Sequence, residues 1–264
     1  MTLLAIKDVS KSFGPVSVLH GVDMSVDRGE VVGLVGDNGA GKSTLMKIVT
    51  GMYTADRGTL TLDGEDILSH SPGERRQMGI EMIYQDLALA KQQDVAANIF
   101  LGREPQRKIL GMNFVDRATM RREAQAMIDR LGARLPAQNR PVGSFSGGQQ
   151  QSVAIARALT FNPKLVIMDE PTAALAVREV QGVLELIRQL KSEGIGVILI
   201  SHRLNDVLSV TDRIVVLNHG RAAANLTTAE TDMTEVVSAI VGGADMAADM
   251  AADMADAAAH EARG

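Results

Sequence analysis

The sequence predicts an α/β protein with a parallel sheet core covered by helices, a small antiparallel sheet at the amino terminus and a helical insert in the middle. Short β-branched apolar runs alternate with amphipathic stretches, which is the pattern of a parallel sheet with helices on its faces. Glycine-containing turns separate the earliest apolar runs, as in an antiparallel sheet. Between about Asp86 and Ser144 no strand-like run is found, and this predicts the insert.

The composition is typical of a soluble globular protein that buries a substantial core. The chain has 264 residues, of which 45% are hydrophobic and 22% charged. No apolar run approaches the roughly 18 residues that would span a bilayer, and Met1–Ser10 does not have the pattern of a secretory signal. The absence of cysteine excludes disulfides and thiolate metal sites, and the net charge of −5 argues against a dedicated nucleic-acid-binding protein. Any role at a membrane would therefore require a partner.

The elements are expected at positions that the local patterns mark. Turns of the antiparallel sheet are expected at Gly14-Pro15, Asp27-Arg28-Gly29 and Asp63-Gly64. Core strands are expected at four apolar runs: Val31–Val35, Leu165–Asp169, Val197–Ser201 and Ile214–Leu217. Helices are expected at Asp116–Gly132 and at Arg178–Glu193, where apolar residues recur at helical spacing and Gly194 provides a natural stop.

A glycine-rich run directly follows the apolar strand Val31–Val35 and precedes the helix-like run Ser43–Val49. It matches the phosphate-binding pattern G-x-x-x-x-G-K-[ST] with Gly36, Asp37, Asn38, Gly39, Ala40, Gly41, Lys42 and Ser43. Backbone N–H groups of such a loop converge on a phosphate, and the following helix adds its positive end. We expect Lys42 to reach the β- and γ-phosphates, Ser43 to ligate Mg²⁺, and Thr44 to complete the ATP-binding run. A flexible glycine turn would not need this strand and helix, so the sequence predicts a P-loop NTPase built on the parallel sheet.

Two adjacent carboxylates, Asp169 and Glu170, end the predicted strand Leu165–Asp169. Ligands of open α/β sheets bind at the carboxyl ends of the strands. Side chains alternate along a strand, so the two acids should diverge and take different roles. We expect Asp169 to hold Mg²⁺ through its hydration shell and Glu170 to orient or deprotonate the attacking water. A strand ending in two acids is more often a solvated strand end, and it is the P-loop that favours the functional interpretation.

A second glycine motif, Ser144-Phe145-Ser146-Gly147-Gly148-Gln149-Gln150, precedes the helix-like run Gln151–Phe161 and has Ser146 in a capping position. Free N–H groups at a helix start, with no side chains in the way, form an anion site. On spacing alone, a capped helix after a glycine turn is the simpler interpretation, because one triphosphate does not obviously need two such loops.

Over about residues 3–242 the sequence resembles the ATP-binding cassette (ABC) ATPases. Their signature motif Leu-Ser-Gly-Gly-Gln is found here as Phe145-Ser146-Gly147-Gly148-Gln149, with phenylalanine in place of leucine. In this family the signature of one cassette completes the nucleotide site of another. The resemblance therefore implies a head-to-tail dimer, with a second copy or another cassette subunit, that encloses two ATP. Ser146, Gly147, Gly148 and Gln149 would then contact the ATP of the partner chain.

The resemblance also implies roles for single residues. Phe13 resembles the aromatic residue that stacks on adenine, and Val18 the small apolar residue beside it. Gln85 resembles the Q-loop glutamine, which contacts Mg²⁺ and links the site to the insert. His202 resembles the switch histidine that senses the γ-phosphate, although a lone histidine is more often structural. Ala176 departs from the family, since many cassettes have aspartate there. The resemblance implies that this difference affects communication between the two ATP sites rather than nucleotide binding.

Three segments resemble bacterial carbohydrate importers of the ribose and fructose type: the P-loop, Asn98–Glu104 and Asp169–Leu175. The resemblance implies an ATP-hydrolysing subunit, using ATP and Mg²⁺, that energises sugar uptake through integral-membrane permease subunits and, indirectly, a periplasmic sugar-binding protein. In having one cassette in its chain, the protein is similar to the fructose-type members. The chain would be a peripheral protein on the cytoplasmic face of the bacterial inner membrane. An importer of another solute, such as an amino acid, and a non-transport cassette protein are the alternatives.

The resemblance implies one ABC ATPase domain over residues 1–242. The RecA-like core with its β subdomain would take about residues 1–85 and 157–242, and the helical subdomain about residues 86–156. Near-repeats of Asp-Met-Ala-Ala then run from Asp245 to Asp256. Aspartates four residues apart repel one another on a helix, and the apolar face would be mostly alanine, so we expect residues 243–264 to form a disordered tail rather than a docking helix.

Overall fold

A six-stranded sheet forms the centre of the protein. The structure is a computed structural model that describes residues 1–109, 111–173 and 175–242, so the expected tail lies outside the described residues. The strand order is β12-β11-β3-β10-β9-β6. The strands are β3 (Val31–Val35), β6 (Ile80–Ile83), β9 (Leu165–Asp169), β10 (Gly196–Ile200), β11 (Arg213–Asn218) and β12 (Arg221–Thr227). All neighbours pair in parallel except β11 and β12.

The four strands expected for this sheet are present, and the α/β fold is confirmed. The strand expected at Val197–Ser201 lies one residue earlier, because Gly196 already pairs with Leu165 of the neighbouring strand. Strands β6 and β12 complete the sheet at its two edges, and the sequence patterns did not identify them.

A four-stranded antiparallel sheet packs beside this core, with the order β2-β1-β4-β5. Its strands are β1 (Thr2–Phe13), β2 (Val16–Asp27), β4 (Arg57–Leu62) and β5 (Glu65–Asp66). The expected turns at residues 14–15, 27–29 and 63–64 lie at the ends of these strands, so the predicted amino-terminal sheet is also confirmed.

The helices are α1 (Lys42–Val49), α2 (Pro72–Gln77), α3 (Val95–Ile99), α4 (Arg117–Arg130), α5 (Gly147–Leu159), α6 (Val177–Ser192) and α7 (Leu204–Val210). Short 3-10 turns span Val142–Ser144 and Thr228–Glu230, and residues 233–242 are helical. Among the described ranges, no helix has both the length and the apolar character needed to cross a bilayer.

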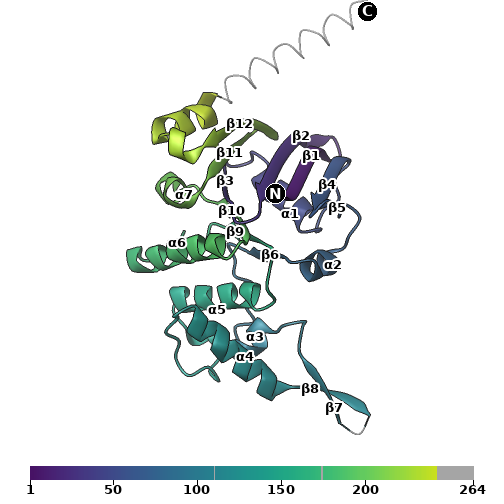
Figure 1. Cartoon of the computed structure of the whole chain (residues 1–264), viewed down its shortest axis with the longest axis vertical. Helices are drawn as coiled ribbons and strands as arrows, with labels where there is room; N and C mark the ends of the chain where they lie inside the picture. Colours follow the sequence, from purple (N-terminus) through teal and green to yellow (C-terminus); the bar gives the residue numbers. More distant parts are fainter. Residues whose placement is uncertain (110, 174, 243–264) are drawn as a thin grey trace, which may run out of the picture.

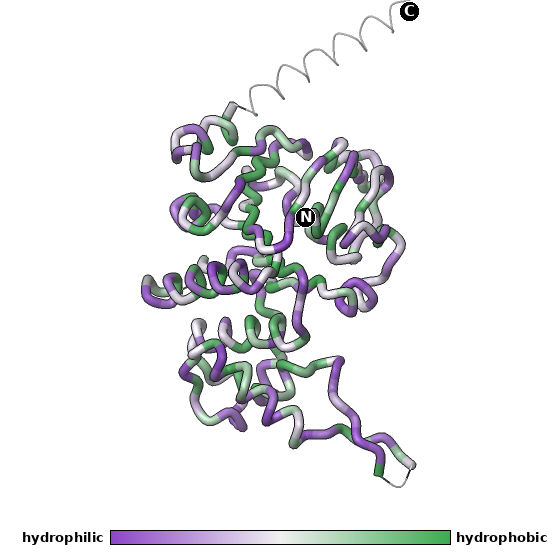
Figure 2. The backbone as a smooth tube through the Cα atoms, viewed as in Figure 1, coloured by the Kyte–Doolittle hydropathy of each residue, from purple (hydrophilic) through white to green (hydrophobic). Residues whose placement is uncertain are grey.

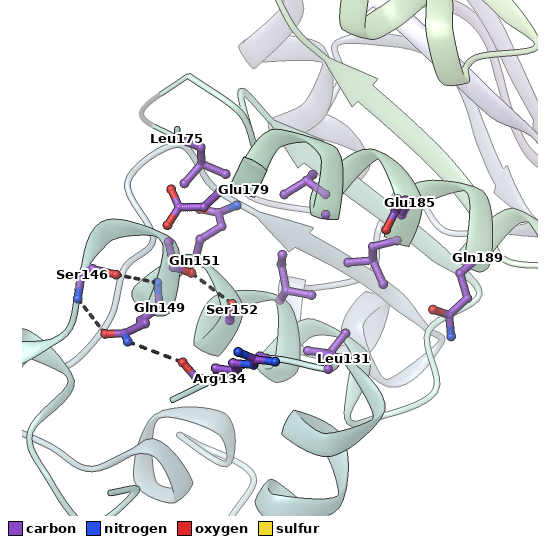
Figure 3. A pocket seen from close by; sticks show the side chains of 17 residues that line it. Leu131, Arg134, Ser146, Gln149, Gln151, Ser152, Leu175, Glu179, Glu185 and Gln189 are labelled. Atoms are coloured by element: carbon purple, nitrogen blue, oxygen red, sulfur yellow. Dashed lines mark hydrogen bonds between the residues drawn. The ribbon is translucent and has the colours of Figure 1, made fainter. Parts of the chain in front are cut away.

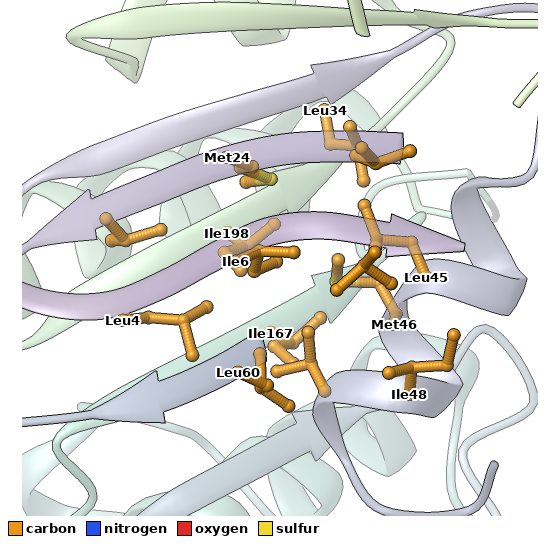
Figure 4. Close-up of a cluster of buried hydrophobic side chains, with 14 of the residues drawn as sticks. Leu4, Ile6, Met24, Leu34, Leu45, Met46, Ile48, Leu60, Ile167 and Ile198 are labelled. Atoms are coloured by element: carbon orange, nitrogen blue, oxygen red, sulfur yellow. The ribbon is translucent and has the colours of Figure 1, made fainter. Parts of the chain in front are cut away.

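Strands β3, β9, β10 and β11 of the central sheet are buried on both faces, and Figure 2 colours much of them as hydrophobic. Ile198 and Ile200 of β10 point to the side covered by α1 and the antiparallel sheet, whereas Val197 and Leu199 point to the side covered by α6 and α7. Figure 4 shows the first side, where Ile167 and Ile198 meet side chains of α1 and β1. Each such large aliphatic side chain contributes about 1.5–3 kcal/mol when fully buried.

The insert contains a β-hairpin that the sequence patterns did not predict. Helices α3, α4 and α5 share a small apolar core that includes Phe100 and Met120, as expected for a helical insert. Strands β7 (Gln106–Ile109) and β8 (Met112–Val115) project from these helices as an antiparallel pair (Figure 1). The expectation of no strand between Asp86 and Ser144 was therefore wrong. All eight residues of the pair are exposed, so no buried face produces the alternation by which strands are recognised.

Arg75 of α2 links the end of α1, the helix after the glycine-rich loop, to the segment that precedes α2 by hydrogen bonds. Its side chain is 1% exposed and donates hydrogen bonds to the carbonyls of Ile48, Val49, Leu68 and His70. Two of these carbonyls belong to the last turn of α1, where backbone oxygens lack helical partners and a cation is favourable. Burial lowers the pKa of Arg75, and the hydrogen bonds to carbonyls offset part of this cost.

Replacing Arg75 with methionine should lower the free energy of unfolding by about 2–4 kcal/mol, because several buried carbonyls would lose their donor. Urea denaturation of the purified chain measures this. Arg76→Met is the matched control, since Arg76 is exposed on the same helix, and it should change the free energy by less than about 0.5 kcal/mol. Equal effects of the two substitutions would show that the buried guanidinium does not stabilise the fold.

Candidate functional site

The glycine-rich loop joins β3 to α1 and is shaped by close backbone contacts. Gly36 has φ of 144°, and a Cβ atom added there would lie 1.9 Å from the carbonyl oxygen of Leu217. Gly41 has φ of 101°, and its added Cβ would lie 2.7 Å from Leu19 Cδ2. A residue with a side chain at Gly36 would have to displace the backbone of β11, and one at Gly41 would displace the Leu19 side chain and be strained by its positive φ. The loop therefore lies close against β11 and Leu19 and ends at the start of α1, where backbone N–H groups have no helical partners and favour an anion.

Lys42 lies at the first position of α1 and folds back over the loop. Its Nζ donates hydrogen bonds to the carbonyl oxygens of Gly36, at 2.6 Å, and Asp37, at 2.9 Å. Burial lowers the pKa of Lys42, while the nearby charges of Glu170, Asp37 and Asp169 raise it. The ammonium group therefore bonds to two loop carbonyls and lies within the electrostatic influence of three carboxylates.

A pocket of about 680 Å³ gathers most of the predicted site residues from separate parts of the chain. It is lined by Val18, Gly36, Asn38, Gly39, Ala40, Gly41, Lys42, Ser43, Thr44, Gln85, Asp169, Glu170, Ile200 and His202. Phe13, at the end of β1, is outside this lining, is 41% exposed and packs edge-on against Tyr53 with ring centroids 5.1 Å apart. Asp37 contributes its carbonyl to Lys42 but is also outside the lining.

Glu170 is held in an unusual backbone conformation just beyond the end of β9. Its φ is 50°, and its N–H donates to the carbonyl of Ile200 on the neighbouring strand at 2.9 Å. Its Oε1 accepts a hydrogen bond from the His202 backbone N–H at 3.0 Å and lies 2.9 Å from His202 Nδ1. Strand alternation therefore does not set the direction of this side chain, because Glu170 has already left the strand. Non-glycine residues with positive φ are uncommon, and at a pocket they are often associated with function.

The second oxygen of the Glu170 carboxylate, Oε2, is buried and has no hydrogen-bond partner among the described residues. Buried carboxylate oxygens are rarely left without a donor, so this atom suits a water or substrate group in the pocket. In the described residues there is also no cluster of three or more metal-binding side chains. Mg²⁺ commonly binds through one or two protein oxygens together with water and substrate phosphates, and Ser43 and Asp169 fit that arrangement.

Asp169, the last residue of β9, lies beside Glu170 in the same pocket. Burial raises the pKa of the Asp169 carboxyl, and the charge of Glu170 raises it further, while Lys42 and Lys47 oppose the rise. The charged form of Asp169 is therefore unfavourable unless a cation is near, which is the electrostatic requirement of a metal-associated carboxylate.

The second glycine motif forms a separate pocket of about 560 Å³, shown in Figure 3. Ser146 caps α5, since its Oγ accepts from the Gln149 N–H at 3.3 Å and Gln149 Oε1 accepts from the Ser146 N–H at 3.0 Å. The pocket shares no lining residue with that of the P-loop. Within one chain, Ser146–Gln149 and the P-loop are therefore distinct sites.

Glu179 of α6 is a residue of this second pocket that the sequence patterns missed. Its carboxylate lies directly over Gly148, where an added Cβ would come within 2.0 Å of Glu179 Oε1. Its Oε2 accepts from the Ala176 N–H at 3.0 Å, and the methyl side chain of Ala176 cannot cap the helix itself. The available signal was a glutamate three residues after the N-cap position Ala176, which is half of a capping box.

Comparisons with known proteins agree with this geometry. A family model described as "ABC transporter" matches residues 19–173. The chain is similar to the xylose/arabinose import ATP-binding protein of Sulfolobus acidocaldarius, at 47% identity over 89% of this chain and 92% of that protein. It is also similar to a ribose import ATP-binding protein of Chromobacterium violaceum, at 44% identity over 90% of this chain and 47% of that protein. The chain thus spans about half the length of the ribose relatives.

Solved structures with the same fold are cassettes of ABC transporters. A nucleotide-free cassette matches with a TM-score of 0.78 at 30% identity, covering 89% of this chain and 98% of that one. A cassette in its ADP conformation matches with a TM-score of 0.77 at 30% identity, covering 91% of this chain and 95% of that one. Both likenesses extend over the core and the insert.

Asp169→Asn should raise the melting temperature of the nucleotide-free protein at pH 8, because it removes a charge that burial and Glu170 make unfavourable. The raised pKa means that folded Asp169 takes up a proton at a higher pH than the unfolded chain. The wild type therefore gains stability as pH falls, and the difference between the two proteins should shrink between pH 8 and pH 5. Calorimetric scans at both pH values measure this, and an equal or lower melting temperature for the variant at pH 8 would contradict it.

Proposed function

Because the chain belongs to the ABC transporter family, we propose that it binds MgATP and hydrolyses it to drive uptake of a monosaccharide of the ribose or fructose type through a partner permease. The observation that carries the ATPase function is the single pocket in which the P-loop meets Gln85, Asp169, Glu170 and His202. The names of the relatives, which import xylose, arabinose and ribose, support a sugar as the solute.

The side chains of the pocket suit distinct steps of phosphoryl transfer to water. Lys42 and the loop N–H groups would bind the phosphates, and Phe13 and Val18 would contact the adenine. Ser43, Gln85 and Asp169 would hold Mg²⁺, which when bound neutralises phosphate charge. Glu170 would orient the attacking water through Oε2, while its Oε1 stays fixed by His202.

The signature residues would complete the site of a second cassette. Ser146, Gly147, Gly148 and Gln149 lie at the start of α5, where free N–H groups favour an anion. Their pocket is separate from the P-loop pocket of the same chain, so a phosphate between the two loops requires two chains in a head-to-tail arrangement. The Glu179 carboxylate over Gly148 would have to move aside or be neutralised as the γ-phosphate arrives.

The partners and place in the cell follow from an import function. The chain would lie on the cytoplasmic face of the bacterial inner membrane, bound to permease subunits, with a periplasmic sugar-binding protein acting through them. Residues 86–103, which connect Gln85 to the hairpin of the insert, are the candidate permease contact. We also propose a division into a core of about residues 1–85 and 157–242 and an insert of about residues 86–156.

Glu170→Gln should bind MgATP and turn it over at least about 100-fold more slowly, because the amide keeps the shape but cannot accept a proton from water. Persistent ATP should then hold two chains together. Light scattering should detect a dimer with MgATP and a monomer with MgADP. Adding Ser146→Arg should remove the dimer while each chain still binds ATP, and hydrolysis near the wild-type rate by Glu170→Gln would refute the role of this carboxylate.

Deleting the gene should abolish uptake of one labelled monosaccharide among xylose, arabinose, ribose and fructose, and spare uptake of labelled amino acids. Wild-type protein supplied in trans should restore uptake, and Glu170→Gln should not, because the transport step needs hydrolysis. Unchanged uptake of all four sugars together with loss of amino-acid uptake would overturn the assignment of the solute.

A further inference from the structure

Glu179 of α6 places a negative charge in the pocket at the start of α5. We call this pocket of about 560 Å³, which Ser146, Gly148 and Gln149 line, the signature pocket. A Cβ atom added at Gly148 would lie 2.0 Å from Glu179 Oε1, so the carboxylate fills the space that the missing side chain leaves. Gly148 is in the first turn of α5, where backbone N–H groups lack helical partners and favour an anion. Glu179 therefore lies beside the helix start that a phosphate of the partner chain's ATP would approach.

The capping bond of Glu179 uses only one of its two carboxylate oxygens. Oε2 accepts a hydrogen bond from the Ala176 N–H at 3.0 Å, and this bond caps the start of α6. Oε1 has no hydrogen-bond donor among the residues that the structure describes, and it lies against Gly148 instead. The side chain is exposed, so it can turn about its own bonds without disturbing the core. The carboxylate therefore rests against α5 without being fixed there.

The charges that line the signature pocket oppose the arrival of a phosphate. Two carboxylates line it, those of Glu179 and Glu185, against one guanidinium group, that of Arg134. A phosphate brought to the start of α5 by a partner chain would meet the Glu179 carboxylate at Gly148, and like charges at short range repel one another. Glu179 therefore opposes the same contact that the helix start favours.

Gln151 offers a second position for this carboxylate. It lies three residues after Gly148 on α5, so the two residues share a face of the helix, and both line the signature pocket (Figure 3). The Gln151 side chain is 7% exposed, and its buried Nε2 has no hydrogen-bond partner within the described ranges. Buried amide donors are rarely left unpaired. A carboxylate oxygen that leaves Gly148 would satisfy this donor about one turn further along α5.

We propose that Glu179 competes with ATP for the signature site: it occupies the start of α5 in the nucleotide-free chain and moves to Gln151 Nε2 when the γ-phosphate of a partner chain's ATP arrives. This inference rests on the function proposed above. Each of the two sites of the dimer contains one Glu179, so its charge raises the dissociation constant of the dimer through both sites. Glu179 thereby limits ATP hydrolysis by chains that no permease holds together.

The test is self-association of the Glu170→Gln chain with saturating MgATP, measured by analytical ultracentrifugation. Adding Glu179→Gln should lower the dissociation constant of the dimer at least about tenfold. The amide keeps an oxygen for the Ala176 N–H but removes the charge that faces the phosphate. Glu185→Gln is the matched control, because it removes the same charge from the same helix and the same pocket, further from Gly148. It should change the dissociation constant by less than about twofold.

Gln151→Leu tests where the carboxylate moves. With Glu179 present, this substitution should raise the dissociation constant of the dimer about fivefold, because the displaced carboxylate loses its donor. With Glu179→Gln the effect should be much smaller, since the phosphate does not repel a neutral amide and the side chain need not move. A purely structural role of Gln151 would instead give equal effects in the two backgrounds, and that result would contradict the proposed movement.

Two results with Glu179→Gln would overturn the inference while leaving the proposed function intact. An unchanged dissociation constant would mean that Glu179 only caps α6, and a higher one would mean that its charge stabilises the dimer. In both cases the Glu170→Gln chain still forms a dimer with MgATP that Ser146→Arg abolishes. Failure of the Glu170→Gln chain itself to form that dimer would instead count against the proposed function.

Discussion

The parallel alignment of β3, β10 and β9 is the constraint on which the nucleotide pocket depends. Because these strands are neighbours in register, their carboxyl ends reach the same edge of the sheet. One strand end leads into the glycine loop, the next into His202, and the third into Asp169 and Glu170. The backbone bond from Glu170 to Ile200 then fixes the acid to the adjacent strand. Residues separated by more than 160 positions thereby become parts of one pocket.

Three residues of this pocket are each held in an energetically unfavourable state. Asp169 and Lys42 both lose solvation, and Glu170 has a left-handed backbone conformation with one oxygen that no described donor satisfies. The buried sheet and the hydrogen bonds from Arg75 to the end of α1 stabilise the surrounding structure, which holds these residues in position. Groups with unmet charge and hydrogen-bonding capacity are prepared to interact with a substrate that carries both phosphates and a cation.

The sequence predicted those parts of the fold and of the pocket that a local residue pattern determines. Apolar runs predicted four strands of the central sheet, and the glycine loop with Asp169 and Glu170 predicted the position of the pocket. The hairpin of the insert could not be predicted, because its exposed strands bury no face and show no alternation. The position of Glu179 over Gly148 also could not be predicted, since it depends on how the separate helices α5 and α6 pack.

The exposed β-hairpin has a consequence for the handling of the isolated protein. Ile109, Met112, Phe114 and Val115 are each at least 40% exposed, and within the described part of the chain no further strand pairs with either outer edge of the two-stranded ribbon. Such a ribbon can add strands from another molecule, and concentrated samples would then self-associate through it. Arg107 and Lys108, on one of its strands, carry like charges that would repel a second copy. High ionic strength, which is often chosen to keep proteins in solution, would here screen that repulsion and favour aggregation.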